Sequence, residues 1–128
     1  MKGPVYILED ALELILGASR ELYPREFIAM LRGEGDTITE VLVIPESLYG
    51  EGFSSIRSYH IPLDKTIIGS VHSHPSRNNK PSEEDLIHFS QSGRIHLIVR
   101  QPALDIGDIA CYDSTGRIMQ LLKKTKRQ

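Results

Sequence analysis

The segment from residue 67 to residue 75 constrains the fold more than any other part of the 128-residue chain. Residues 67–71 form a short apolar run that predicts a buried β-strand, and this run continues directly into His72, Ser73, His74 and Pro75. Because successive side chains of a strand point to opposite faces, the imidazoles at positions i and i+2 project from the same face of the sheet. Two imidazoles placed in this way can chelate a metal ion.

A third metal ligand follows the two histidines at the start of a predicted helix. Pro75 ends the strand and begins a polar loop, and Ser82 is a suitable N-cap that places Asp85 in the first helical turn. Two histidines and one carboxylate leave the fourth tetrahedral position of Zn²⁺ to water, which is typical of catalytic rather than structural sites. Water bound in such a site has a pKa of about 7 and supplies hydroxide near neutral pH. The single cysteine, Cys111, excludes cysteine-rich zinc sites and an internal disulfide.

Length and charge exclude several other classes of protein. A chain of 128 residues has the size of one domain, and its 40% apolar content is sufficient for a buried core. Lys and Arg number 15 against 17 for Asp and Glu, so no basic excess attracts nucleic acid. No apolar run approaches the roughly 20 residues that span a bilayer, and acidic residues interrupt the N-terminal segment where a signal peptide would be apolar. We expect a cytoplasmic protein that binds neither nucleic acid nor a membrane.

The hydrophobic pattern predicts an α/β fold in one domain over residues 1–122. Apolar residues at helical spacing predict a helix over residues 9–22, and a second helix runs from Ser82 to about residue 92. The predicted strands are residues 27–31 (with a start near Glu26), 37–44, 67–71, 95–99, 106–112 and 118–122. The first two of these strands form an antiparallel hairpin around a turn at residues 33–36.

Two segments without regular structure are expected. Residues 46–58 contain two glycines and four serines without a period, which predicts a surface loop able to move over a site. Residues 123–128 are basic and are expected to form a frayed, solvated C-terminal tail.

The spacing of these residues resembles that of a known family. His72, Ser73, His74 and Pro75, followed after six residues by Ser82 and after two more by Asp85, match the motif of the JAMM (MPN+) zinc metalloproteases. That family also has a glutamate just after the first helix, and Glu26, followed by Phe-Ile-Ala-Met-Leu, occupies the corresponding place. The resemblance covers nearly the whole chain.

The resemblance implies a fold, a set of roles and a substrate class. The fold would be a single MPN domain with a mixed, curved β-sheet flanked by helices, related to that of cytidine deaminases. His72, His74 and Asp85 would bind one Zn²⁺, Glu26 would act as general base and acid, and Ser82 would donate to the oxyanion. Family members cleave isopeptide or peptide bonds after the C-terminal Gly-Gly of ubiquitin-like modifier proteins, including those attached to lysine. Compact members resemble archaeal enzymes that act on small archaeal modifiers. The oligomeric state is left open.

Several simpler interpretations compete with these roles. Ser82-x-x-Asp85 is also a capping box, and capping and metal binding compete for one carboxylate. Ser73 points away from its two neighbours, so a buried, hydrogen-bonded hydroxyl is more plausible than a nucleophile. Cys111 is expected to be an inert core residue. The remaining histidines, His60, His88 and His96, are expected to be structural. For His88, a supporting role beside the metal ligands stays open.

Two alternative functions remain open, and a third lacks the residues that it requires. The chain could be a non-catalytic MPN scaffold, although such members usually lack metal ligands and this chain has all of them. It could instead process a sulfur-carrier protein fusion rather than a lysine conjugate. A zinc deaminase on the related fold requires His-x-Glu with Pro-Cys-x-x-Cys, which one cysteine cannot supply.

Overall fold

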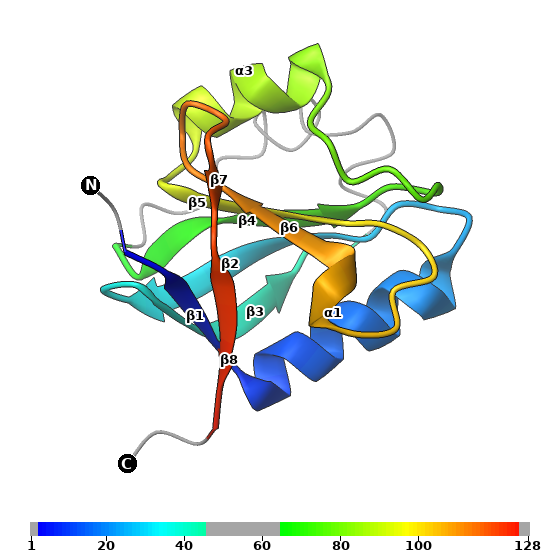
Figure 1. The fold of residues 1–128 in the computed structure, drawn as a ribbon, viewed down its shortest axis with the longest axis horizontal. Helices are drawn as coiled ribbons and strands as arrows, with labels where there is room; N and C mark the ends of the chain where they lie inside the picture. The colour runs from blue at the N-terminus through cyan, green and yellow to red at the C-terminus, as the bar shows by residue number, and fades with distance from the viewer. Residues whose placement is uncertain (1–2, 46–64, 126–128) are drawn as a thin grey trace.

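The computed structural model describes residues 3–45 and 65–125, which form one curved mixed sheet with a helix on each side (Figure 1). The strand order is β7-β6-β5-β4-β2-β3-β1-β8. The strands are β1 (Val5–Leu8), β2 (Ile28–Glu34), β3 (Thr37–Val43), β4 (Ile67–Ser73), β5 (Ile95–Val99), β6 (Ile109–Tyr112), β7 (Ile118–Met119) and β8 (Leu121–Lys124). The helices are α1 (Glu9–Leu22), α3 (Glu83–Gln91) and the short 3₁₀-helix η2 (Ile106–Asp108). This architecture confirms the predicted α/β class.

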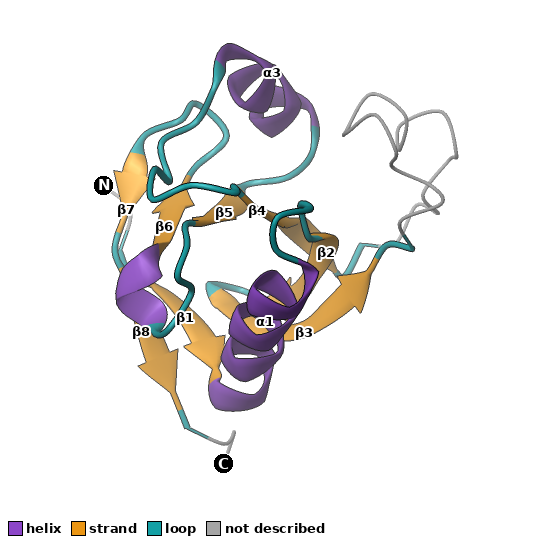
Figure 2. Cartoon of the chain, turned by 90° about the vertical axis from the view of Figure 1, so that its right-hand side faces the viewer, coloured by secondary structure: helices purple, strands orange, loops and turns teal. Residues whose placement is uncertain are grey.

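The last strand segment brings the two ends of the sheet together. β7 pairs antiparallel with β6, whereas β8, one residue further along, pairs parallel with β1. Between them, the carbonyl oxygen of Gln120 accepts a hydrogen bond of 2.9 Å from the amide of Val5. One segment therefore bridges both edges, and the sheet curves almost into a barrel around α1 (Figure 2).

The two helices cover opposite faces of the sheet and define two clusters of buried side chains. α1 buries an apolar stripe, including Ile15, inside the curve of the sheet. α3 packs Phe89 on the other face, against Ile98 of β5 and Tyr112 of β6. All five residues of β5 are buried, because helices cover both of its faces and an apolar run is the only pattern that suits both.

The central strand β4 is held between an antiparallel and a parallel neighbour. It pairs with β2 on one side, with Ile28 opposite His72, and with β5 on the other, with Ile98 opposite His72. The connection from β4 to the parallel strand β5 runs through α3, as a crossover between parallel strands requires. The same crossover carries α3 back over the end of β4, which is where the predicted site lies.

Most predicted elements are present, and the differences have local causes. The first helix, the hairpin and the second helix are confirmed. β4 continues past Val71 through Ser73, and β2 begins at Ile28 rather than near Glu26. The prediction of a strand from residue 106 is wrong for its first three residues, which form η2 because the Asp105 side chain accepts from the Gly107 amide and caps that turn.

The N- and C-terminal segments also differ from the prediction. β1 was not predicted, since four residues that run directly into a helix show no strand alternation long enough to detect. The predicted strand over residues 118–122 is divided into β7 and β8. Lys123 and Lys124 were expected in a frayed tail but belong to β8, and Lys123 Nζ lies 3.6 Å from Glu9 Oε2.

Some predictions fall on residues outside the described part of the chain. The loop over residues 46–58 and His60 lie there, so the proposed movement of that loop stays a prediction. Within the described residues, no helix combines the length and the apolar character needed to cross a bilayer.

Alanine substitutions at two glycines, one in the sheet and one in α1, should change the free energy of unfolding with opposite signs. A methyl group at Gly69 would lie 1.5 Å from the carbonyl oxygen of Ile95, whereas one at Gly17 would meet only Arg20 Nη2 at 4.0 Å. We expect Gly69→Ala to lower the free energy of unfolding by about 3 kcal/mol through overpacking. Gly17→Ala should raise it by about 1 kcal/mol through helix propensity. Urea unfolding measures both values, and a stable Gly69→Ala variant would contradict the described β4–β5 pairing.

Candidate metal centre

Backbone pairing on both sides fixes the two histidines at the end of β4. The Ser73 amide donates to the Phe27 carbonyl at 2.9 Å, and the His74 amide donates to the Val99 carbonyl at 2.8 Å. His72 is buried and His74 half-buried, and their Nε2 atoms lie 3.2 Å apart on one face of the strand. Ser73 points the other way, where its buried hydroxyl accepts from the Phe27 amide at 2.8 Å. The predicted alternation of these side chains is confirmed.

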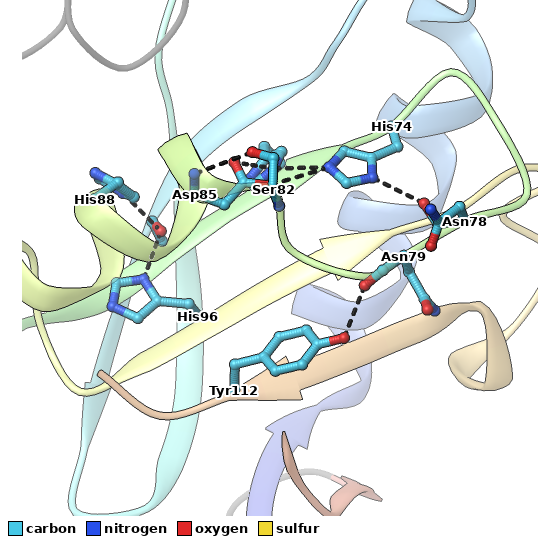
Figure 3. A network of polar contacts seen from close by, with 10 residues as sticks. His74, Asn78, Asn79, Ser82, Asp85, His88, His96 and Tyr112 are labelled. Atoms are coloured by element: carbon cyan, nitrogen blue, oxygen red, sulfur yellow. Dashed lines mark hydrogen bonds and ion pairs between the residues drawn. The ribbon is translucent and has the colours of Figure 1, made fainter. Parts of the chain in front are cut away.

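Asp85 reaches the two imidazoles from the first turn of α3. The Asp85 amide donates to Ser82 Oγ at 3.1 Å, and the Ser82 amide donates to Asp85 Oδ2 at 2.9 Å, which completes a capping box. The same carboxylate places Oδ1 3.2 Å from His72 Nε2 and Oδ2 3.4 Å from His74 Nε2 (Figure 3). One carboxylate therefore faces both sets of partners, and the expectation that capping and metal binding compete for it stays a prediction.

The separations between the candidate ligand atoms suit a tetrahedral zinc ion. Zn–N and Zn–O bonds of about 2.0–2.1 Å place neighbouring ligands of a tetrahedron roughly 3.3 Å apart. His72 Nε2 and His74 Nε2 lie 3.2 Å apart, and the two oxygens of Asp85 approach them separately, with Oδ1 3.2 Å from His72 and Oδ2 3.4 Å from His74. Within the described residues, these three form the one group of histidine, cysteine or acidic side chains with convergent ligand atoms. The cluster fits one zinc ion.

A backbone contact sets the tautomer of His74 for metal binding. His74 Nδ1 lies 2.8 Å from the carbonyl oxygen of Asn78, which can only accept, so Nδ1 carries the proton. In the neutral ring, Nε2 then presents a lone pair toward the Asp85 carboxylate. Two acceptors facing each other require a cation between them, either a proton or a metal ion.

Sequence reasoning missed Asn78, because a backbone carbonyl can belong to any residue and leaves no signal in the sequence. The polar composition of residues 76–80 indicated only a turn. The structure shows how that turn is held: the Asn78 amide donates to Ser76 Oγ at 3.2 Å, and the Lys80 amide donates to Asn78 Oδ1 at 2.9 Å.

The electrostatics of the metal-free cluster favour a positive charge. A hydrogen bond with Asp85 raises the pKa of His74 above its ordinary value of 6.5, against the opposing effect of burial. Burial acts to raise the pKa of Asp85, but hydrogen bonds from His72 and His74 outweigh it and hold that pKa well below its ordinary value. The carboxylate therefore stays ionised and available to a cation.

Glu26 lies beside the cluster, immediately before β2. The pairing of Ile28 with His72 and the hydrogen bonds between Phe27 and Ser73, continued by one residue, place Glu26 next to His74. The negative charge of Glu26 contributes to the raised pKa of His74, and its side chain is exposed to solvent. An exposed carboxylate next to a metal ligand can exchange protons with solvent and with a molecule bound there.

A chain of buried and part-buried hydrogen bonds lies under α3, beyond the metal cluster (Figure 3). His96 Nε2 lies 3.1 Å from the Gly93 carbonyl, so His96 Nδ1 accepts from Ser70 Oγ at 2.7 Å. Ser70 Oγ in turn accepts from His88 Nε2 at 3.1 Å, and Ser92 Oγ donates to His88 Nδ1 at 3.3 Å. All of these hydrogen bonds are donated in one direction along the chain of residues. Together they join α3 to β4 and β5.

The remaining singled-out residues are buried in structural positions. Burial lowers the pKa of His96 to about 4, so its ring is neutral and stacks on Phe89 with a centroid separation of 4.4 Å. His88 contacts Ser70, two residues before His72 on the same face of β4. Burial raises the pKa of the Cys111 thiol to about 12, which confirms an inert core cysteine.

Comparison with known proteins identifies the family. The model of prokaryotic homologues of the JAB domain matches residues 8–113. A protein from Haloferax volcanii named a probable metalloprotease is 35% identical over 127 residues, covering 91% of this chain and 78% of that protein. The chain belongs to the prokaryotic JAB-domain family. This membership confirms the resemblance to JAMM proteins on which the predicted roles depend.

Two solved structures resemble the JAB-domain chain along nearly its whole length. A JAB1/MPN domain protein from Archaeoglobus fulgidus has a TM-score of 0.73 and 34% identity, over 93% of this chain and 98% of that one. A structure described as JAMM, a metalloprotease-like zinc site in the proteasome and signalosome, has a TM-score of 0.72 and 31% identity, over 94% and 98%. The curved mixed sheet with two helices is therefore the JAB/MPN fold.

Asp85→Asn separates the two functions of the Asp85 carboxylate. Asparagine retains an oxygen that accepts from the Ser82 amide but loses the negative charge that the cation needs. We expect this variant to fold. It should bind zinc at least about tenfold more weakly, because one of the three protein ligands of the metal is lost or weakened. Chelator competition measures the affinity. Glu84→Gln in the same helical turn is the control and should bind as the wild type, and equal affinities for all three proteins would contradict the assigned site.

Acid should weaken zinc binding in a predictable window. The pKa of His74 is raised in the metal-free protein, so its proton-mediated pairing with Asp85 stabilises that form below pH 6.5 and is lost as pH rises through the raised pKa. Zinc needs the neutral imidazole, so the zinc-bound form gains in stability over the same rise. We expect the difference in melting temperature between zinc-loaded and metal-free protein to shrink as the pH falls from about 8 to about 5.5. A constant difference would contradict the competition.

Proposed function

We propose that this JAB-domain protein is a zinc metallopeptidase that hydrolyses the bond after the C-terminal Gly-Gly of ubiquitin-like modifier proteins, including their lysine conjugates. The observation that carries the proposal is the convergence of His72, His74 and Asp85 with an exposed Glu26 at the same end of the sheet. Family membership and the likeness to structures with a metalloprotease-like zinc site support the class of reaction.

The metal ligands and the acid have separate tasks in this reaction. His72, His74 and Asp85 would hold one zinc ion, and such an ion would supply an activated water and a Lewis acid for the scissile carbonyl. The Glu26 carboxylate accepts the proton of the attacking water and delivers it to the departing amine nitrogen. Its exposure lets it reach a bound protein chain from the solvent side of the cluster.

Ser82 is placed to stabilise negative charge on the substrate. Its Oγ accepts from the Asp85 amide at 3.1 Å, and this contact uses an oxygen lone pair and leaves the hydroxyl proton available. Ser82 is exposed and adjoins a metal ligand through the capping box. The hydroxyl therefore acts as a donor to the oxyanion of the tetrahedral intermediate.

Two features support a modifier tail as the substrate. The connections around the cluster are short, with three residues between α3 and β5 and six between β5 and η2, so these segments carry no large insertion over the site. Glycine residues lack side chains and lie extended against a strand, where main-chain hydrogen bonds hold them. The complete ligand set argues against a non-catalytic scaffold, and a panel of lysine conjugates and linear sulfur-carrier fusions separates the two peptidase substrates.

Replacement of Glu26 by glutamine tests the general base. The amide cannot accept the proton of the attacking water, so we expect kcat to fall by about 10²–10⁴-fold while zinc content stays at one ion per chain. Hydrolysis of ubiquitin-like conjugates, followed by gel or mass spectrometry, measures the loss. Glu21→Gln, an exposed change at the end of α1, is the matched control. Full activity of Glu26→Gln would exclude the assigned base.

Ser82→Ala tests the oxyanion donor, and Ser82→Thr is its control. Alanine removes both the donor and the helix cap, so we expect kcat about 10²–10³-fold lower and a stability loss of about 1 kcal/mol. Threonine keeps the hydroxyl and should recover most of both quantities. If alanine lowers the melting temperature without changing kcat in the folded protein, Ser82 is only a cap.

A further inference from the structure

A pocket of about 440 Å³ adjoins the loop that follows His74, and the charged residues that line it are arginines. It lies between the end of α1, the loop that follows His74, and the segment after β5. Its lining residues are Arg20, Tyr23, Pro75, Ser76, Arg77, Gln101 and Pro102. Among the described residues, no carboxylate lines this pocket. A second pocket along α1, which Arg20 also lines, differs in this respect, since Glu9, Glu13 and Asp105 line it.

Hydrogen bonds fix the wall of this pocket relative to the metal cluster. The Gln101 amide donates to the Ser76 carbonyl at 2.7 Å, and Gln101 Nε2 donates to the Ser19 carbonyl of α1 at 3.1 Å. Arg20 Nη1 donates to the Ala103 carbonyl at 2.6 Å. A guanidinium carries five N–H donors, so the exposed Arg20 retains donors for a ligand. The pocket is therefore preorganised on the side of α1.

The charges in the pocket are unusual for this protein. The chain carries a net charge of −2, yet two arginines, Arg20 and Arg77, line this pocket. Arginine binds carboxylates through two parallel hydrogen bonds, which makes it selective for carboxylates over neutral amides. The ring of Tyr23, which is 52% exposed, offers an apolar surface beside the cations. Such a pocket suits a peptide with an acidic side chain.

The short chain separation of His74 and Arg77 limits the distance between the metal cluster and this pocket. Arg77 follows His74 by three residues, so their Cα atoms lie at most about 11 Å apart. An extended peptide advances about 3.3 Å per residue. A span within this limit corresponds to about two to four residues of an extended peptide on either side of the cleaved bond.

We propose that this pocket, through Arg77 and Arg20, is a specificity subsite for an acidic residue two to four positions from the scissile bond. The inference rests on the proposed peptidase function and adds a preference that the metal cluster cannot supply. It predicts selection among Gly-Gly-containing substrates by the charge of the residues that flank the cleaved bond.

Binding of labelled peptides to zinc-loaded Glu26→Gln protein tests the subsite without turnover. The probes are Gly-Gly-Lys peptides with a Glu pair before the glycines, a Glu pair after the lysine, or Gln pairs at both places. We expect one Glu peptide to bind about fivefold more tightly than the Gln peptide at low salt, as for a partly exposed ion pair, and to lose this advantage at high salt. Fluorescence anisotropy measures the affinities, and the better Glu peptide identifies the side of the bond.

Substitutions in the pocket assign the preference to its arginines. In the Glu26→Gln background, Arg77→Ala should remove most of the Glu preference and Arg77→Glu should reverse it, whereas the exposed Arg117→Ala should change nothing. Equal binding of the Glu and Gln peptides, or equal effects of Arg77→Ala and Arg117→Ala, would overturn the subsite. Hydrolysis by the wild-type chain is scored separately: cleavage without a Glu preference refutes the subsite alone. A Glu preference that depends on Arg77 in a chain that cleaves no conjugate refutes the peptidase function alone.

Discussion

The carboxylate of Asp85 connects the fold of this protein to its chemistry. It closes the capping box that starts α3 and simultaneously faces both imidazoles at the end of β4. α3 crosses over the sheet between two parallel strands, so its first turn must begin near the end of β4. The metal cluster thus depends both on the capping box that starts α3 and on the crossover between β4 and β5. Disturbing either feature would separate the three side chains of the cluster.

The sheet supplies rigidity where the ligands need it and exposure where a substrate needs access. Pairing on both sides fixes His72 and His74, while the network of Ser70, His88 and His96 ties α3 to the strands below it. By contrast, Glu26 and Ser82 are exposed at the rim. This division suits a hydrolase in which the metal ligands stay fixed and the groups that exchange protons meet the substrate.

The sequence predicted the parts of the structure that depend on local chemistry. Alternation along a strand placed His72 and His74 on one face, and the N-cap at Ser82 located Asp85. Parts that depend on partners distant in sequence were missed: β1 is recognisable only by its pairing with β3 and β8, and Asn78 contributes a carbonyl group that every residue has. The double role of the Asp85 carboxylate, which closes the capping box and also faces both imidazoles, was missed as well, because spacing alone does not show that one carboxylate can face two sets of partners.

X-ray absorption at the zinc edge of the loaded, wild-type protein tests the central claim most directly. Two imidazole nitrogens and two oxygens, one from Asp85 and one from water, should surround the ion at about 2.0–2.1 Å. Scattering from a sulfur ligand, from fewer than two imidazoles, or from a six-coordinate shell of oxygens would show that zinc binds elsewhere and would contradict the metal centre described for this chain.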